Sequence, residues 1–237
     1  MQYLLLVCAE GPVHECLLDD ALLLGRMLVD LMPDEPEAVG LLALMLLHDA
    51  RRGARRRARE FVPLSDQDRS RWDRARITEG IALADRAARA GRPGPFQLRA
   101  EIAACHDSAP GYAQTDWWRI SLLYGQLARM DSFASVIPCQ SLAVGMADSP
   151  EVGLLIVGEP PAVKSADPTD GRFPTVGGTP PLAVRYQLLP GIRGYLLRLS
   201  GLLAESADAY REALDAAASI AQFRAELLGP RASFEAS

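Results

Sequence analysis

Lysine is nearly missing from this chain of 237 residues, because Lys164 is the single lysine among 25 basic residues. Aromatic residues make up only 6% of the sequence, and acidic residues outnumber basic ones to give a formal net charge of −5. Domains that bind nucleic acid usually carry a basic surplus that attracts phosphate groups. The charge balance therefore argues against nucleic acid as a partner.

Cysteine and histidine are also scarce and irregularly placed. The four cysteines show no C-x-x-C spacing, and neither they nor the three histidines are spaced as metal ligands. We expect free thiols in a reducing compartment, and we expect neither a metal nor another cofactor. The sequence also lacks a glycine-rich phosphate loop and a G-x-S-x-G nucleophile elbow.

No apolar run approaches the roughly 18 residues that a membrane-spanning helix needs. Residues 1–8 are apolar, but they lack a basic start and Glu10 follows them, so they do not match a secretory signal. We therefore expect a cytoplasmic protein with no membrane partner. Hydrophobic residues make up 49% of the chain, which is enough to bury a core.

Helical periodicity is what the sequence does contain. Residues 17–32 place leucines at helical spacing, and residues 38–47 are apolar on every side, as in a buried central helix. Ser65 is expected to cap a helix that carries Trp72 on one face, and residues 115–116 are expected to cap another. Further helices are predicted over 96–106, over 134–147, after Pro150, over 183–199 and over 203–217. The sequence therefore predicts an all-α helical array.

Two stretches interrupt this pattern. Six arginines crowd into residues 51–59, and residues 160–181 are rich in proline and glycine, as in an extended loop. We therefore expect a helical domain over 1–158, a loop over 159–181, and a helical pair with its tail over 182–237. In that pair, residues 197–201 are followed by small residues and Tyr210, a pattern that resembles a tetratricopeptide repeat.

Five strings along the chain form a distinctive set. They are LDDALLLGRMLVDLMPDEPEAVGLLALMLLHDARR (18–52), VPLSDQDRSRWDRARITEG (62–80), GRPGPFQLRAEIAACH (91–106), TDWWRISLLYGQL (115–127) and AVGMADSPEVGL (143–154). Together they resemble the C-terminal extension of a group of bacterial extracytoplasmic-function sigma factors. The resemblance covers about residues 3–225 and implies a helical fold with tetratricopeptide-like helices.

Two departures from that family pattern bear on function. The DNA- and polymerase-binding domains that precede the extension are expected to be absent, and no helix-turn-helix is recognisable. Residues 137–142 stand where the family carries a Glu-Leu-Asn-Arg-like stretch, so that Asn and Arg are lost. We therefore expect a stand-alone module that does not direct RNA polymerase.

Three residues are candidates for acid–base catalysis, namely Glu101, His106 and His48. His48 precedes Asp49, and a carboxylate beside an imidazole suits proton transfer, although a basic side chain at a helix C-terminus is also favourable without any catalysis. Glu101 lies on an otherwise apolar helix, where the alternative to catalysis is a salt bridge to an arginine of another helix.

Five residues are candidate ligand contacts, chosen for aromatic area or polar groups: Trp117, Tyr124, Trp72, Gln97 and Arg52. Trp117 and Trp118 point about 100° apart around their helix, so both cannot face one core. Trp117 and Tyr124 lie seven residues apart and share a face. For Trp72, the alternative is a packing anchor.

These patterns leave two classes of function open. The first is a protein that binds a small organic molecule in an interhelical groove, with catalysis by the three acid–base candidates as one form of it. The second is a regulatory module that binds a protein partner and not DNA. An open polar groove would favour binding, whereas an enclosed apolar pocket with titratable groups would favour an enzyme.

Overall fold

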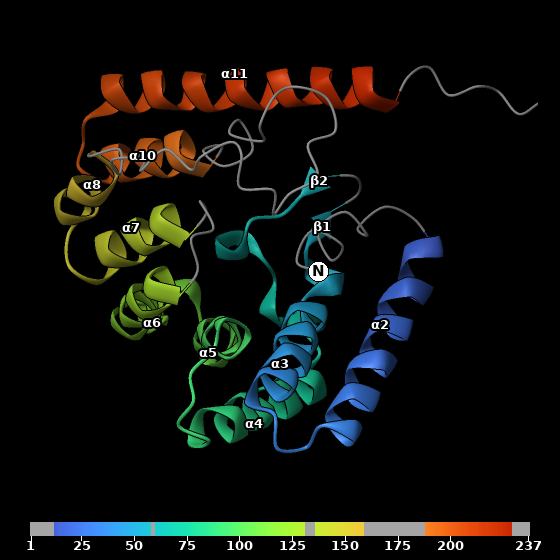
Figure 1. Cartoon of the computed structure of the whole chain (residues 1–237). Helices are drawn as coiled ribbons and strands as arrows, with labels where there is room; N and C mark the ends of the chain where they lie inside the picture. Colours follow the sequence, from blue (N-terminus) through green and yellow to red (C-terminus); the bar gives the residue numbers. More distant parts are fainter. Residues whose placement is uncertain (1–11, 58–59, 131–135, 159–187, 229–237) are drawn as a thin grey trace, which may run out of the picture. The chain divides into compact units, whose positions relative to one another are not determined.

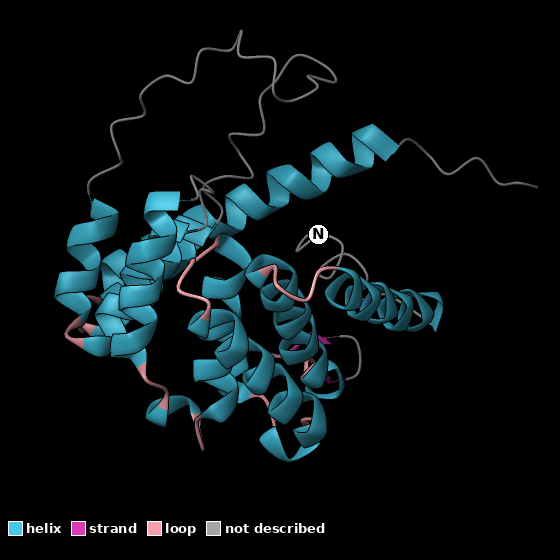
Figure 2. Cartoon of the chain, turned by 60° about the horizontal axis from the view of Figure 1, so that its bottom comes forward, coloured by secondary structure: helices cyan, strands magenta, loops and turns pink. Residues whose placement is uncertain are grey.

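The computed structural model describes residues 12–57, 60–130, 136–158 and 188–228, and Figure 1 draws the whole chain. Helices dominate these ranges (Figure 2), which confirms the predicted all-α fold. Within them, β-structure is limited to strands β1 (Arg56–Arg57) and β2 (Glu60–Phe61), which pair antiparallel. The chain divides into two compact units, Met1–Asp131 and Ser132–Ser237. The predicted loop over 159–181 lies outside the described ranges, so the three-part division stays a prediction.

The first unit is organised around one central helix, α3. This helix packs against α2, α4 and α5 and is buried on nearly every side, as its apolar sequence predicts. Gly40 lets α3 and α5 approach, because a Cβ there would lie 2.7 Å from the backbone nitrogen of Gln97. The helices described in this unit are α2 (Pro12–Leu31), α3 (Pro36–Ala50), α4 (Arg74–Arg89), α5 (Pro95–Ser108) and α6 (Trp117–Met130).

The segment between α3 and α4 differs from the prediction. Ser65 does not cap a long helix, because it lies in a short 3-10 turn, η2 (Leu64–Asp66), which is followed by η3 (Arg69–Arg71). Helix α4 starts only at Arg74, and Asp73 caps it by accepting hydrogen bonds from two backbone N–H groups at 3.0 and 3.1 Å. Serine and aspartate are both good N-caps, so residue type alone did not separate them. Trp72 consequently precedes the helix instead of lying on its face.

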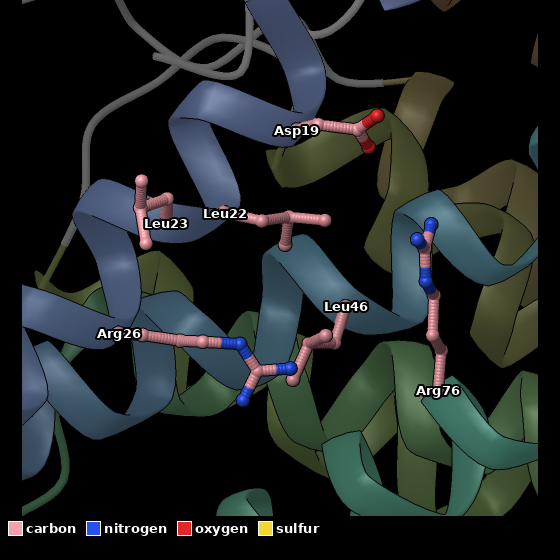
Figure 3. Close-up of a pocket in the computed structure, with 6 residues that line it drawn as sticks. All are labelled: Asp19, Leu22, Leu23, Arg26, Leu46 and Arg76. Carbon is pink, nitrogen blue, oxygen red and sulfur yellow. The ribbon is translucent and has the colours of Figure 1, made fainter. Parts of the chain in front are cut away.

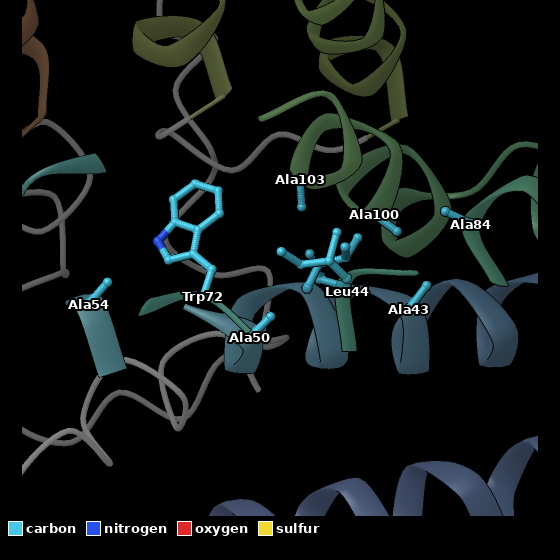
Figure 4. Packing of buried hydrophobic residues seen from close by; sticks show 10 residues of the cluster. Ala43, Leu44, Ala50, Ala54, Trp72, Ala84, Ala100 and Ala103 are labelled. Carbon is cyan, nitrogen blue, oxygen red and sulfur yellow. The ribbon is translucent and has the colours of Figure 1, made fainter. Parts of the chain in front are cut away.

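Small side chains fill the centre of the first unit. A buried cluster of mostly alanines joins α3, α4 and α5, and Figure 4 shows Trp72 between Ala54 and the rest of the cluster. Alanine brings helices close together and leaves no cavity between them. The labelled members besides Trp72 are Ala43, Leu44, Ala50, Ala54, Ala84, Ala100 and Ala103. Trp72 is therefore part of the hydrophobic core as well as a neighbour of the polar groups described below.

The second unit contains the predicted C-terminal helical pair. Its described helices are α7 (Val136–Ala147), α8 (Pro150–Gly158), α10 (Leu188–Leu199) and α11 (Leu203–Leu228). Helices α10 and α11 pack together closely at Gly194, where a Cβ would lie 3.1 Å from the ring of Tyr210. The hydroxyl of Ser206 donates a hydrogen bond of 2.8 Å to the Gly194 carbonyl. The first residues of the predicted pair, 183–187, lie outside the described ranges.

Membrane insertion was not expected from the sequence. Across the ranges that the structure describes, no helix is both long enough and apolar enough to cross a bilayer.

Candidate binding site

Buried and half-buried polar groups lie at the C-terminal ends of α3 and α5. The guanidinium charges of Arg51, Arg69 and Arg55 all act on the carboxyl of Asp107, and those of Arg51 and Arg69 also lie against Trp72. We call these five residues the arginine cluster. The backbone N–H of Asp73 donates a hydrogen bond of 2.9 Å to the Ala50 carbonyl at the end of α3. That bond holds the residue after Trp72 at the end of α3, close to Arg51.

Trp72 forms the apolar side of the cluster and is 3% exposed. The guanidinium carbon of Arg69 lies 4.3 Å from the centre of its ring, and that of Arg51 lies 6.0 Å away. A cation over an indole face is attracted by the ring's quadrupole, with about 0.5–2 kcal/mol per contact. Trp72 thus stabilises two cations at once, which lowers the cost of crowding them.

Arg69 also contacts the end of α5. Its Nη1 donates hydrogen bonds to the carbonyls of His106 and Ala109, at 2.9 and 2.8 Å. The last carbonyls of a helix lack partners within it, so a basic side chain there is favourable. Nη2 of the same guanidinium is buried and has no hydrogen-bond partner among the described residues.

Asp107 is the acidic member of the cluster and is 1% exposed. One of its oxygens lies 3.5 Å from Nε of Arg51, and neither oxygen accepts a hydrogen bond from a described residue. Burial raises the pKa of this carboxyl to about 6, although the positive charges of Arg51 and Arg69 act in the opposite direction. A carboxylate in the last turn of α5 also opposes the helix dipole, so Asp107 depends on its arginine neighbours.

Both candidate catalytic histidines of this region are held neutral. Nδ1 of His48 lies 3.2 Å from Nη2 of Arg55, and because arginine only donates, this nitrogen is the acceptor. Burial, followed by the charges of Arg51 and Arg55, lowers the pKa of His48 well below its usual value. Burial also lowers the pKa of His106 to about 3, with Arg51 and Arg69 adding to the effect. At neutral pH both rings are therefore neutral imidazoles, and neither acts as an imidazolium acid.

Trp117 packs against His106 inside the unit. The two ring centres lie 5.2 Å apart at 74°, and the ring of Tyr112 lies 5.1 Å from Trp117 on an edge-to-face contact. Trp118 points outward instead and is 65% exposed, so the two tryptophans diverge as their spacing predicts. Tyr124 is half-buried farther along α6.

Glu101 and Gln97 lie together on α5, as predicted, but they contact different partners from the histidines. Glu101 forms a salt bridge of 3.2 Å with Arg119 of α6, which is the interhelical bridge that the sequence left open as the alternative. The side-chain amide of Gln97 lies 3.5 Å from the Glu101 carboxylate. The backbone N–H of Gln97 is bonded by the Glu37 carboxylate at 3.0 Å, which links α3 to the first turn of α5.

Arg52 belongs to a second set of ion pairs beside His48. Its Nε donates to Asp49 at 2.6 Å, and its guanidinium also pairs with Asp19 of α2 at 3.1 Å. Arg76 of α4 pairs with the same Asp49 carboxylate. The buried Asp49 therefore links the end of α3 to Arg52, just after that helix, and to Arg76 of α4. These two arginines balance its negative charge.

A pocket of about 260 Å³ lies between α2, α3 and α4 (Figure 3), next to these ion pairs. It is small, since pockets for drug-sized ligands measure roughly 300–1,000 Å³. Its charged side chains are already paired within the protein, Arg26 with Glu79 among them. The residues that line it are Asp19, Leu22, Leu23, Arg26, Leu46 and Arg76.

Comparison with known proteins gives two sequence similarities and no activity. A family of unknown function, DUF6596, matches residues 7–88. An uncharacterized protein of Rhizobium meliloti (strain 1021) is 38% identical over 208 residues, which cover 86% of this chain and 45% of that relative. The chain thus spans about half the length of the relative it matches. No solved structure matches the chain.

The structure brings some of the predicted residues together and separates others. His48, Trp72, His106 and Trp117 lie in or beside the arginine cluster, and Arg52 lies next to it. Glu101 and Gln97 are tied to Arg119 and Glu37 instead. Within the described ranges no group of acidic, cysteine or histidine side chains is placed to hold a metal ion.

The predicted site residues did not include four members of the arginine cluster, namely Arg51, Arg55, Arg69 and Asp107. One signal for Asp107 was available, because an acidic residue in the last turn of a predicted helix needs a nearby cation. The six arginines in 51–59 offered several such cations. Pairing them with Asp107 required the contact between the ends of α3 and α5, which no local pattern gives.

Proposed function

We propose that this chain is a helical binding module that takes a small organic molecule at the arginine cluster. The observation that carries the proposal is that several buried N–H donors of the cluster, next to the Trp72 ring, have no hydrogen-bond acceptor among the described residues. Buried polar atoms are normally paired, and each exception calls for a partner. Nη2 of Arg69, Nε of Arg51 and Nε1 of Trp72 all lack one among the described residues.

Binding is supported over acid–base catalysis by the state of the candidate residues. An effective general acid or base has a pKa near the working pH. The pKa of His106 is lowered to about 3 and that of His48 is also depressed, while Glu101 is engaged with Arg119. Acid–base catalysis on the bound molecule by these three residues is a more specific proposal, which requires binding first.

The resemblance to the extension of extracytoplasmic-function sigma factors supports a binding role as well. That resemblance rests on the five strings given above, and the match to DUF6596 covers the first two of them. Under this proposal the chain keeps the helical scaffold of such an extension and uses it to hold a ligand. It does not contact DNA, in keeping with its acidic balance.

Tryptophan fluorescence tests the small-molecule proposal. The purified chain is titrated with a panel of organic acids, sugars, amines and nucleosides, beside the variants Trp72→Phe and Trp118→Phe. We expect a saturable change that Trp118→Phe retains and Trp72→Phe loses, because Trp72 lies in the cluster and Trp118 is exposed. A change that Trp118→Phe loses, or no change with any compound, would contradict the proposal.

A second candidate function, docking of a protein partner, is favoured by helix α2. This helix exposes a row of large apolar side chains, of which Leu23 also lines the pocket of Figure 3. They are Leu23, Leu24, Met27 and Leu31, and their spacing of three and four residues places them along one side of the helix. Exposed apolar patches of this kind commonly mark protein contacts. The occupant we propose is the part of the longer relative that lies outside the match.

A further inference from the structure

Positive charge is in excess within the arginine cluster. Among the described residues, the only salt bridge that any of Arg51, Arg55 and Arg69 makes is that of Arg51 with Asp107. Arg55 bonds to a neutral imidazole and Arg69 to backbone carbonyls, neither of which carries a charge. Among the residues whose side chains the structure describes, Arg55 and Arg69 thus form no salt bridge of their own, although both are half-buried.

This excess is costly to the folded protein. Burial and the charge of Arg51 lower the pKa of Arg55 to about 10, which means that the folded state disfavours its protonated form. Buried charges are normally paired, because an isolated one loses its hydration. Proteins keep such unfavourable groups mainly where they serve a function.

A purely structural role explains only part of the arrangement. Arg69 caps the end of α5 through Nη1, and Arg51 neutralises Asp107. Neither role uses Nη2 of Arg69, which is buried and unpartnered, and neither involves Arg55. Since guanidinium groups only donate hydrogen bonds, a partner for this nitrogen is an acceptor, and a negatively charged acceptor would also offset the positive charge of the cluster.

The cluster also reaches the surface. Arg55, Arg69, His48 and His106 are each half-buried, whereas Trp72 and Asp107 lie beneath them. A ligand's acidic group can therefore approach the half-buried guanidinium groups of Arg55 and Arg69 from the solvent. Planar forks of N–H donors match carboxylate and phosphate oxygens in pairs.

We infer that this site takes an anion, a carboxylate or phosphate group that accepts hydrogen bonds from Arg55 and Arg69, the two cations that share Asp107 as their acidic neighbour. The inference rests on the proposed function, which it narrows by naming the charge of the ligand. The carboxylate would belong to an organic acid and the phosphate to a phosphorylated compound. The same guanidinium N–H groups would bind either one.

Thermal unfolding with inorganic sulfate, then with phosphate and succinate, tests the anion site. Each titration of the full chain is compared with sodium chloride at equal ionic strength, which removes general screening. We expect sulfate to raise the unfolding midpoint by about 3 °C beyond chloride at saturation. Arg55→Gln is expected to lose this extra shift and to unfold, without sulfate, at or above the wild-type temperature.

The matched control is Arg89→Gln, which removes one exposed guanidinium from the end of α4 and is expected to keep the full sulfate response. Arg69→Gln serves as a second test should Arg55→Gln fail to fold. Equal sulfate shifts in all variants would overturn the inference. If sulfate, phosphate and succinate all give no extra shift while a neutral compound still changes Trp72 fluorescence, the binding proposal stands and the anion site does not. A larger response to phosphate than to succinate identifies a phosphorylated compound, and the reverse an organic acid.

Discussion

Asp107 combines two opposing influences at one carboxyl. Its burial raises its pKa, whereas four arginines oppose that rise: Arg51 and Arg55 after α3, Arg69 of η3 and Arg74 at the start of α4. Burial is the larger effect, so the pKa lies at about 6 instead of the usual 3.8. The folded chain therefore binds a proton at this carboxyl more tightly than the unfolded chain does.

The stability of the chain should reflect this shift. Because the folded pKa is raised, the Asp107 contribution to the free energy of unfolding is present below pH 3.8 and is lost as the pH rises through about 6. Relative to Asp107→Asn, the wild type should gain about 1 kcal/mol between pH 7 and pH 5. Urea unfolding at several pH values measures the difference.

The comparison with Asp107→Asn isolates this carboxyl from the histidines. His48 and His106 have lowered pKa values, so their contribution acts in the opposite direction and falls as the pH drops below about 6.5. Both rings are present in both proteins, and their contributions cancel in the difference. A difference that does not change between pH 7 and pH 5 would show that Asp107 titrates normally.

At the scale of single elements, the start of α4 is the clearest correction to the sequence analysis. The predicted cap, Ser65, lies in a 3-10 turn, and Asp73 accepts the hydrogen bonds instead. Both residues precede acidic or polar neighbours and apolar positions farther on. Tertiary contacts decide between them, since the bond from the Asp73 N–H to Ala50 holds the helix start against α3.

Removing each candidate cap in turn tests this assignment. Asp73→Ala should lower the free energy of unfolding by about 1 kcal/mol, because two N–H groups of the first turn lose their acceptor. Ser65→Ala should change it by less than about 0.5 kcal/mol, as at most exposed positions. Urea denaturation of both variants measures the contrast, and equal losses would argue against Asp73 as the cap.

The buried helix α3 and the divergence of Trp117 from Trp118 followed directly from the sequence. A run that is apolar all round has no solvent face, and two adjacent helical residues cannot share one direction. The arginine cluster did not follow, because it depends on residues about 40 to 55 positions apart, from Arg51 to Asp107. Hydrophobic periodicity predicts each helix separately and does not say which helix ends contact each other.

At the scale of the whole molecule, the chain matches about half of a longer relative. Helix α2 exposes the large apolar side chains of Leu23, Leu24, Met27 and Leu31, which suits contact with a further protein surface. The second candidate function therefore predicts a complex between this chain and the part of the Rhizobium meliloti relative that lies outside the match. Size-exclusion chromatography and calorimetry of the two purified proteins measure it.

The variants for that measurement replace leucines whose side chains are exposed, so that the substitution does not disturb the core. Leu31→Glu, at a side chain that is 79% exposed, should weaken the complex about tenfold without harming the fold. Leu214→Glu on α11, at a side chain that is 69% exposed, makes the same chemical change in the other unit and should have no effect. Absence of a complex, or equal loss with both variants, would argue against docking on α2.

The enclosure of α3 also bears on how sequences of this kind diverge. A helix with a solvent-facing side can accept exchanges there at little cost, whereas nearly every position of α3 is packed against a neighbour. At Gly40 even one added methyl group would collide with the backbone of α5. We therefore expect substitutions between related sequences to accumulate mainly in other segments, and the sequence of α3 to be the most similar part when distant relatives are aligned.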